Sequence, residues 1–293
     1  MKLEGSFTAL VTPFADGKLD LGSLRGMLRF QLRSRTAGVV PCGSTGEAAT
    51  LSAEEYRQVV SLAVSECRGR IPVIPGIGTN STERAVAAAR EAEGLGADAL
   101  LVLVPYYNKP TQEGMFRHFQ AAARAVRIPV VVYNIPGRTG VNLQPATLAR
   151  LAKACRNITA TKEAAGSLDQ VSEILCRCPK GFTVLSGDDS LTVPMMSVGA
   201  RGVISVVANI LPKESAAMCA AALRGDFAAA RRWHLRLFPV IKALFMETNP
   251  IPVKAAAELA GLCRGEPRLP LTPLSAENRR SLAAAFRGAG FRL

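Results

Sequence analysis

Short apolar segments alternate with longer amphipathic segments along most of the chain. The apolar segments begin near Ser6, Ala37, Ile71, Asp98, Pro129, Asn157, Phe182 and Gly202. Runs such as residues 100–104 and 130–132 contain no polar position, which is typical of strands buried on both faces of a parallel sheet. Eight consecutive βα units predict an α/β fold in which the strands close into a (β/α)8 TIM barrel. An open doubly wound sheet is the alternative, because the alternation alone does not distinguish the two.

The amphipathic segments carry the local signals of helices. The first one places four leucines on a single face: Leu21, Leu24, Leu28 and Leu32. Further along, Ser52 and Glu55 have the spacing of a capping box, and Pro145 stands where a first-turn proline belongs. These signals support helices between the predicted strands.

The strand pattern stops after about residue 224, and the remaining chain has a helical pattern. An Ala/Arg-rich stretch follows Asp226, a second helical stretch follows Pro252, and a third is capped at Ser275. The proline-bearing residues 264–273 form a connector. We therefore expect residues 1–224 to form the barrel that carries the site and residues 225–293 to form a C-terminal helical extension.

The composition is that of an ordinary globular protein of 293 residues, with 48% hydrophobic and 20% charged residues. No apolar run approaches the roughly 18 residues that span a bilayer. The first residues lead directly into a strand without the hydrophobic region of a signal peptide. We expect a cytoplasmic protein with no membrane partner.

Cysteine and histidine usage argues against a metal centre. The seven cysteines, an odd number, are scattered through predicted core elements at positions 42, 67, 155, 176, 178, 219 and 263. Reduced thiols explain them better than disulfides or a zinc site. The two histidines, His118 and His234, both lie in helical stretches, which makes a histidine-based metal centre or triad improbable.

The net charge is +13, so a nucleic-acid partner has to be considered. The arginines, however, are dispersed along the helices and form no cluster in the sequence. We expect no nucleic-acid partner. A positive field could instead speed the capture of anionic substrates.

In a parallel barrel, the chemistry lies at the carboxyl ends of the strands. The second strand ends in Gly43-Ser44-Thr45-Gly46-Glu47, a turn whose N–H groups and hydroxyls can hold a carboxylate. An ordinary Gly-rich βα turn is the simpler interpretation. The fourth strand leads to the paired tyrosines Tyr106 and Tyr107. Their hydroxyls could take part in the chemistry, the rings could lie at an interface between subunits, or they could simply pack within the fold.

The fifth and sixth strands end in the most reactive candidates. Tyr133 stands where its hydroxyl can pass protons, and Arg138 follows in a Pro/Gly loop, where it can bind a carboxylate. Lys162 ends an apolar strand. Apolar walls would disfavour its charged form, and the neutral amine is a nucleophile for Schiff-base chemistry. A lysine that extends to solvent is the alternative. After the seventh strand, Asp188 and Asp189 suit a helix cap better than a metal site.

Over essentially its full length, the chain resembles the pyruvate-dependent class I aldolase superfamily, which includes N-acetylneuraminate lyase and dihydrodipicolinate synthase. The motif 43–47 and the strand-end lysine mark the superfamily. The dihydrodipicolinate synthase branch is the better match, on four segments: residues 105–110, 133–140, 162–164 and 249–254. Arg138 favours this branch because the lyases lack an arginine there. Another pyruvate-dependent aldolase or lyase is the alternative within the superfamily.

The resemblance implies a lyase of lysine (diaminopimelate) biosynthesis that condenses pyruvate with L-aspartate 4-semialdehyde. It implies that Lys162 forms the Schiff base and that Thr45, Tyr107 and Tyr133 relay protons, with Tyr107 acting in a neighbouring subunit's site. By the same resemblance, Ser44 and Thr45 hold the pyruvate carboxylate and Arg138 binds the semialdehyde carboxylate. The Ile204 carbonyl is expected to lie near the lysine. It also implies a homotetramer built as a dimer of dimers, with no metal or organic cofactor.

Two departures from the family pattern concern substrate binding and regulation. Ser44 replaces a threonine found in many synthases, but it keeps the hydroxyl. In lysine-inhibited members, a cleft at the dimer interface holds free lysine with polar residues and a glutamate. The matching positions here are Ala49, Ala53, Tyr56, Asn80, Arg84 and Tyr106. Arg84 stands in place of the glutamate and would repel an ammonium group. Glu83 points about 100° away around the helix, so we expect weak or absent inhibition by lysine.

Overall fold

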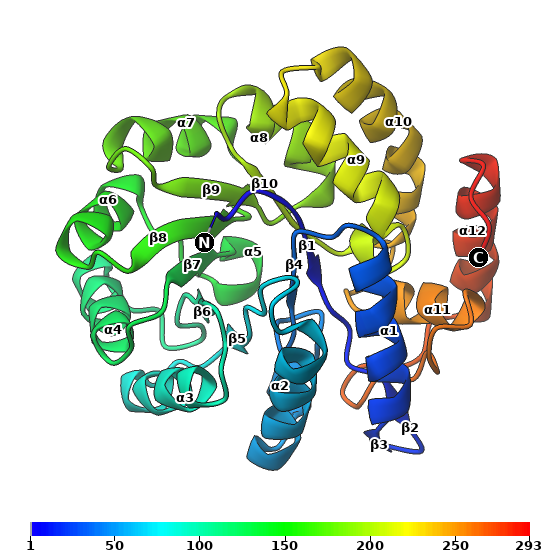
Figure 1. Ribbon diagram of the computed structural model, residues 1–293, viewed down its shortest axis with the longest axis horizontal. Helices are drawn as coiled ribbons and strands as arrows, with labels where there is room; N and C mark the ends of the chain where they lie inside the picture. Colours follow the sequence, from blue (N-terminus) through cyan, green and yellow to red (C-terminus); the bar gives the residue numbers. More distant parts are fainter. Residues whose placement is uncertain (1) are drawn as a thin grey trace.

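The computed structural model describes residues 2–293, in which a ring of eight parallel strands is surrounded by helices (Figure 1). The strands of the ring are β1 (Gly5–Ala9), β4 (Gly38–Val40), β5 (Gly76–Ile77), β6 (Leu100–Leu103), β7 (Val130–Asn134), β8 (Ile158–Glu163), β9 (Thr183–Ser186) and β10 (Gly202–Ser205). Their order is β4-β1-β10-β9-β8-β7-β6-β5. β1 therefore pairs with both β4 and β10, as a barrel requires.

The ring closes between β4 and the segment that leads into β5, which we call the seam (residues 38–41 against 72–77). Val39 forms a parallel bridge with Val73. The Val39 N–H donates to the Pro72 carbonyl at 3.0 Å, and the Ile74 N–H donates to the Val39 carbonyl at 2.9 Å. The predicted closed barrel is confirmed, and the open sheet is excluded.

The third strand is shorter than the sequence pattern suggests. The pattern places its start at Ile71, whereas regular strand structure is confined to β5, after the isolated bridge at Val73. Pro72 and Pro75 have no N–H group, so these two positions of the segment cannot donate a ladder hydrogen bond. The prolines explain why the segment follows the barrel wall without forming a continuous strand.

Helices cover the outside of the ring (Figure 1). They are α1 (Leu21–Arg33), α2 (Ala53–Cys67), α3 (Thr82–Gly94), α4 (Gln112–Arg124), α6 (Pro145–Ala154), α7 (Leu168–Arg177), α8 (Thr192–Ser197) and α9 (Pro212–Leu223). Ser52 and Glu55 form the predicted capping box, and Pro145 is the first residue of α6. A hairpin of β2 (Phe14–Ala15) and β3 (Lys18–Leu19) was not predicted. None of the helices within residues 2–293 has both the length and the apolarity to cross a membrane.

Two hydrophobic cores result from the alternation of side chains along each strand. On β7, Val131 and Tyr133 point into the barrel, whereas Val130 and Val132 point to the helices. The inner core also holds Phe7 from β1 and Leu185 from β9. Apolar side chains thus fill the barrel axis beneath its mouth.

The C-terminal segment forms α10 (Phe227–Ala243), α11 (Ile251–Leu259) and α12 (Ala276–Gly288). It is joined to the barrel by a buried ion pair between Lys254 Nζ on α11 and Glu47 Oε1 in the loop after β4, 2.5 Å apart. Both side chains are almost completely buried, and Glu47 also accepts the Arg268 N–H at 2.9 Å. The division at residue 224 remains a prediction, but these contacts tie the two parts at the barrel mouth.

Replacing Lys254 with methionine should destabilise the protein by about 3 to 5 kcal/mol, because the Glu47 carboxylate would stay buried without its partner charge. The measurement is the free energy of unfolding in urea. Arg264→Met is the matched control: it removes an ion pair with Asp16 whose side chains are 54% and 82% exposed, so it should change stability far less. Equal effects of the two substitutions would contradict a special role for the buried pair.

Candidate active site

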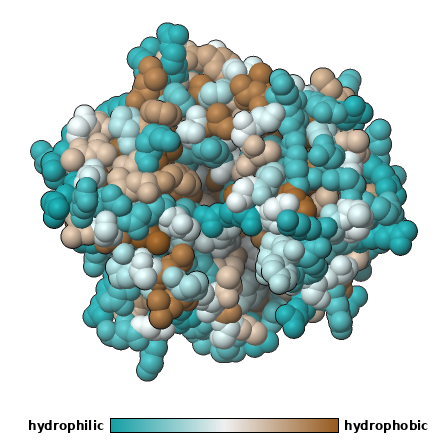
Figure 2. Space-filling view, turned by 180° about the vertical axis from the view of Figure 1, so that it is seen from behind, coloured by the Kyte–Doolittle hydropathy of each residue, from teal (hydrophilic) through white to brown (hydrophobic). Residues whose placement is uncertain are grey.

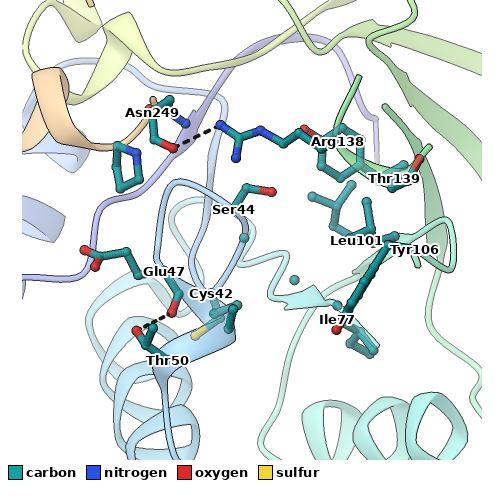
Figure 3. A pocket seen from close by; sticks show the side chains of 18 of the residues that line it. Cys42, Ser44, Glu47, Thr50, Ile77, Leu101, Tyr106, Arg138, Thr139 and Asn249 are labelled. Carbon is teal, nitrogen blue, oxygen red and sulfur yellow. Dashed lines mark hydrogen bonds between the residues drawn. The ribbon is translucent and has the colours of Figure 1, made fainter. Parts of the chain in front are cut away.

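A cavity of about 340 Å³ opens at the carboxyl ends of the strands. Its walls include Tyr133. They also include Ser44, Ile77, Leu101, Arg138 and Asn249, which Figure 3 labels. Ile77 and Leu101 provide an apolar side, Ser44 and Asn249 lie across from them, and the Arg138 side chain reaches over the cavity to Asn249 (Figure 3). The view from behind the barrel, in Figure 2, shows a mostly hydrophilic face that is hollowed near its centre. An apolar cavity with a few convergent polar groups is the usual form of a small-molecule site.

Lys162 and Tyr133 meet at the inner end of this cavity. They are register partners on β8 and β7. Lys162 is 6% exposed and Tyr133 is 5% exposed, and Lys162 Nζ lies 4.2 Å from the centroid of the tyrosine ring. Because Tyr133 lines the cavity, the lysine lies just behind the cavity wall and inside the barrel. The structure thus excludes the alternative in which Lys162 extends into bulk solvent.

Close packing fixes the lysine stem. Gly187 follows β9, and a Cβ built there would lie 2.6 Å from the Cβ of Ala164 and 3.3 Å from the Cε of Lys162. A larger residue would therefore push on the strand end that carries Lys162. The absence of a side chain at position 187 lets the two strands hold the amine in one place.

The loop from Gly43 to Glu47 brings two hydroxyls to the mouth. Ser44 lines the cavity, whereas Thr45 is 4% exposed and its Oγ1 accepts a hydrogen bond from Asn249 Nδ2 at 2.9 Å. Cys42, just before the loop, also lines the cavity, but burial raises the pKa of its thiol far above neutrality. The thiol is therefore no nucleophile. The hydroxyls and the loop N–H groups are the polar groups that this wall can offer to a ligand.

Arg138 lies on the short helix α5 (Pro136–Thr139) at the rim of the cavity. Its Nη2 donates to the main-chain carbonyl of Asn249 at 3.0 Å (Figure 3). The side chain is otherwise exposed to the cavity side. A guanidinium held at one nitrogen keeps further N–H groups for a carboxylate.

Besides Lys162 and Thr45, two more predicted site residues, Tyr107 and Ile204, do not line the cavity. Tyr107 is 87% exposed and has a left-handed backbone with φ +71°, whereas its neighbour Tyr106 does line the cavity. Ile204 is 1% exposed within the inner core on β10. The predicted roles of Tyr107 and of the Ile204 carbonyl remain predictions.

A buried polar network lies behind the lysine, and no pattern in the sequence predicted it. Glu163, the residue after Lys162, accepts from Asn134 Nδ2 with both oxygens at 3.1 Å and from the Ala165 N–H at 2.7 Å. Gln170 donates to the same carboxyl group at 3.2 Å. Burial raises the pKa of Glu163, and these hydrogen bonds oppose that rise. Since Asn134 and Glu163 are register partners, the network fastens β7 to β8 next to Tyr133 and Lys162.

The two aspartates after β9 have separate structural roles. Asp188 accepts from the Ser190 N–H at 2.8 Å and caps the short helix η2 (Asp189–Leu191), as predicted. Asp189 Oδ2 accepts from the N–H groups of Val206 and Val207, just after β10. Over residues 2–293, His, Cys, Asp and Glu side chains form no group of three that could hold a metal ion.

A second cavity of about 360 Å³ shares part of the same wall, including Ala49, Ile77 and Tyr106. It brings together the six positions that the resemblance assigns to a lysine cleft: Ala49, Ala53, Tyr56, Asn80, Arg84 and Tyr106. Glu91 also lines it, but its carboxylate pairs with Arg57 at 2.6 Å.

Comparisons with known proteins identify the family. The model of the Dihydrodipicolinate synthetase family matches residues 2–289. A 4-hydroxy-tetrahydrodipicolinate synthase from Pelobacter propionicus is 52% identical over 287 residues, which are 98% of this chain and 99% of that protein.

Solved structures agree with this assignment. The crystal structure of dihydrodipicolinate synthase from Aquifex aeolicus has a TM-score of 0.97 and 47% identity and covers 99% of both chains. The chloride-inhibited dihydrodipicolinate synthase from Acinetobacter baumannii, complexed with pyruvate, has a TM-score of 0.96 and 42% identity and covers 99% of this chain and 100% of that one. The chain belongs to the dihydrodipicolinate synthetase family.

Proposed function

We propose that this member of the dihydrodipicolinate synthetase family catalyses the reaction for which its relatives are named, 4-hydroxy-tetrahydrodipicolinate synthesis. The enzyme would be a lyase of lysine (diaminopimelate) biosynthesis that condenses pyruvate with L-aspartate 4-semialdehyde. The observation that carries the proposal is Lys162, buried inside the barrel against Tyr133 at the end of a cavity that also presents Ser44 and Arg138.

The first half of the reaction uses the amine. Neutral Lys162 attacks the ketone carbon of pyruvate, and loss of water leaves an iminium. Ser44 and Thr45 hold the carboxylate of pyruvate. Tyr133, Thr45 and Tyr107 move the protons that carbinolamine formation and water loss require. Removal of a methyl proton then converts the iminium to an enamine, whose terminal carbon is nucleophilic.

The second half forms the carbon–carbon bond. The enamine carbon attacks the aldehyde carbon of the semialdehyde, whose carboxylate is bound by Arg138 at the rim. The amino group of that substrate then attacks the iminium carbon, closes the ring and displaces Lys162. The Ile204 carbonyl would stand near the lysine. Side chains supply every proton transfer in this scheme, so it needs no metal or organic cofactor.

The assembly and location follow the family expectation. We propose a cytoplasmic homotetramer built as a dimer of dimers, in which Tyr107 reaches the site of a neighbouring copy. The high exposure of Tyr107 and its absence from the cavity wall of its own chain support this placement.

Borohydride reduction in the presence of pyruvate should trap a single adduct on Lys162, located by peptide mass spectrometry, because only a Schiff base is reduced to a stable amine. Lys162→Ala should abolish the adduct. Lys153→Ala, which changes an exposed lysine on α6, is the control and should leave trapping intact. Wild-type protein that gives no adduct, or an adduct elsewhere, would refute the proposed function.

Arg138→Ala should raise the KM for the semialdehyde by about 10- to 100-fold, since a hydrogen-bonded charge pair contributes about 1.5 to 3 kcal/mol. Trapping with pyruvate should persist, because the arginine serves the second substrate. Steady-state kinetics with each substrate varied in turn is the measurement, with the exposed Arg117→Ala as control. Loss of pyruvate capture equal to the loss of semialdehyde binding would contradict the assigned role.

Free lysine should inhibit weakly or not at all, because Arg84 lines the second cavity and would repel the ammonium group. Arg84→Glu should increase sensitivity to lysine, while Arg84→Gln, which removes the charge only, should increase it less. Initial rates over a lysine series measure this. Half-maximal inhibition of the unmodified enzyme at sub-millimolar lysine would refute the expectation.

A further inference from the structure

Asn249 connects the two substrate-binding walls of the cavity. It lies between α10 and α11, so it reaches the site from the C-terminal segment. It lines the cavity and is 6% exposed. Its side-chain Nδ2 donates to Thr45 Oγ1 at 2.9 Å, and its main-chain carbonyl accepts from Arg138 Nη2 at 3.0 Å. Figure 3 shows the second contact crossing the mouth above Ser44.

The contact with Thr45 sets the direction of a proton. An amide nitrogen only donates, whereas a hydroxyl has one proton and two lone pairs. Because Thr45 Oγ1 accepts from Asn249, the hydroxyl proton of Thr45 must point to another acceptor. Asn249 therefore presets Thr45 as a donor before any substrate arrives.

This orientation of the Asn249 amide has a cost. Asn249 Oδ1 is buried and has no hydrogen-bond partner, which costs about 1 to 3 kcal/mol. The Thr45 hydroxyl could satisfy that oxygen if the amide were turned by 180°, but Thr45 would then donate to Asn249 and not to a ligand. The observed orientation leaves the oxygen unpaired and keeps the Thr45 proton free.

We infer that Asn249 is a positioning residue that holds the Thr45 hydroxyl as a hydrogen-bond donor to the carboxylate of the 2-oxo acid. The inference rests on the proposed function, in which Thr45 binds pyruvate. A carboxylate is an acceptor only, so a hydroxyl locked as a donor favours a 2-oxo acid over a ketone that has no acceptor in place of the carboxylate. The side chain acts on pyruvate, whereas the main-chain carbonyl of the same residue steadies Arg138.

This separation defines the experiment. Asn249→Ala keeps the main-chain carbonyl, so it should lower kcat/KM for pyruvate by about 5- to 10-fold, the value of one hydrogen bond, and leave the KM for the semialdehyde nearly unchanged. Asn249→Asp should lower kcat/KM for pyruvate further, because a carboxylate would accept the Thr45 proton and repel the substrate anion. Asn249→Ser, which keeps a donor, should retain more activity than Asn249→Ala. Asn278→Ala, on α12, is the control.

A double-mutant cycle with Thr45→Val tests the route of the effect. In the Thr45→Val background, Asn249→Ala should have almost no further effect on kcat/KM for pyruvate, because the hydroxyl it orients is gone. Thermal unfolding identifies variants that fail to fold, and Asn249→Ser then takes the place of Asn249→Ala. An undiminished effect in that background, or a rise in the semialdehyde KM alone, would overturn the inference. Absence of a borohydride adduct in the unmodified enzyme would instead overturn the proposed function.

Discussion

The buried ion pair between Glu47 and Lys254 is the interaction on which the geometry of the mouth depends. Glu47 ends the loop that presents Ser44 and Thr45, and Lys254 belongs to α11, just beyond Asn249. Two charges removed from water remain favourable only together. The pair therefore sets the distance between the carboxylate-binding loop and the C-terminal segment, so two parts of the chain about 200 residues apart build one site.

The barrel interior imposes a complementary constraint on the reactive amine. The alternation of side chains sends Tyr133 and Lys162 inward from adjacent strands, into a core otherwise made of residues such as Val131 and Leu185. On the outer side of the same two strands, Asn134 and Glu163 join them by hydrogen bonds. A slip of β8 by one residue would turn the Lys162 amine away from the cavity and the Glu163 carboxyl into the apolar core. Register is thus held by polar contacts outside and by packing inside.

The sequence predicted the parts of this protein that depend on local pattern. The βα alternation implied a closed barrel, and the capping signals at Ser52 and Pro145 stand where helices begin. Lys162 and Tyr133 could be found because they lie at the carboxyl ends of strands, and Arg138 because it follows one, where a parallel barrel places its chemistry.

What the sequence left open depends on contacts between distant segments. Asn249 and Lys254 stood in a segment that carried the resemblance, yet no pattern assigned them a role, since their partners Thr45 and Glu47 are about 200 residues away.

The seam is a further consequence of such contacts. Its prolines leave few ladder bonds, and a Cβ at Gly76 would lie 2.3 Å from the Cys42 carbonyl oxygen. Local opening is easiest where backbone bonds are fewest. Amide hydrogens of the seam should therefore exchange with solvent sooner than those of the β7–β8 pair. The barrel wall beside the carboxylate-binding loop would then open locally more often than the wall that holds the Lys162 amine.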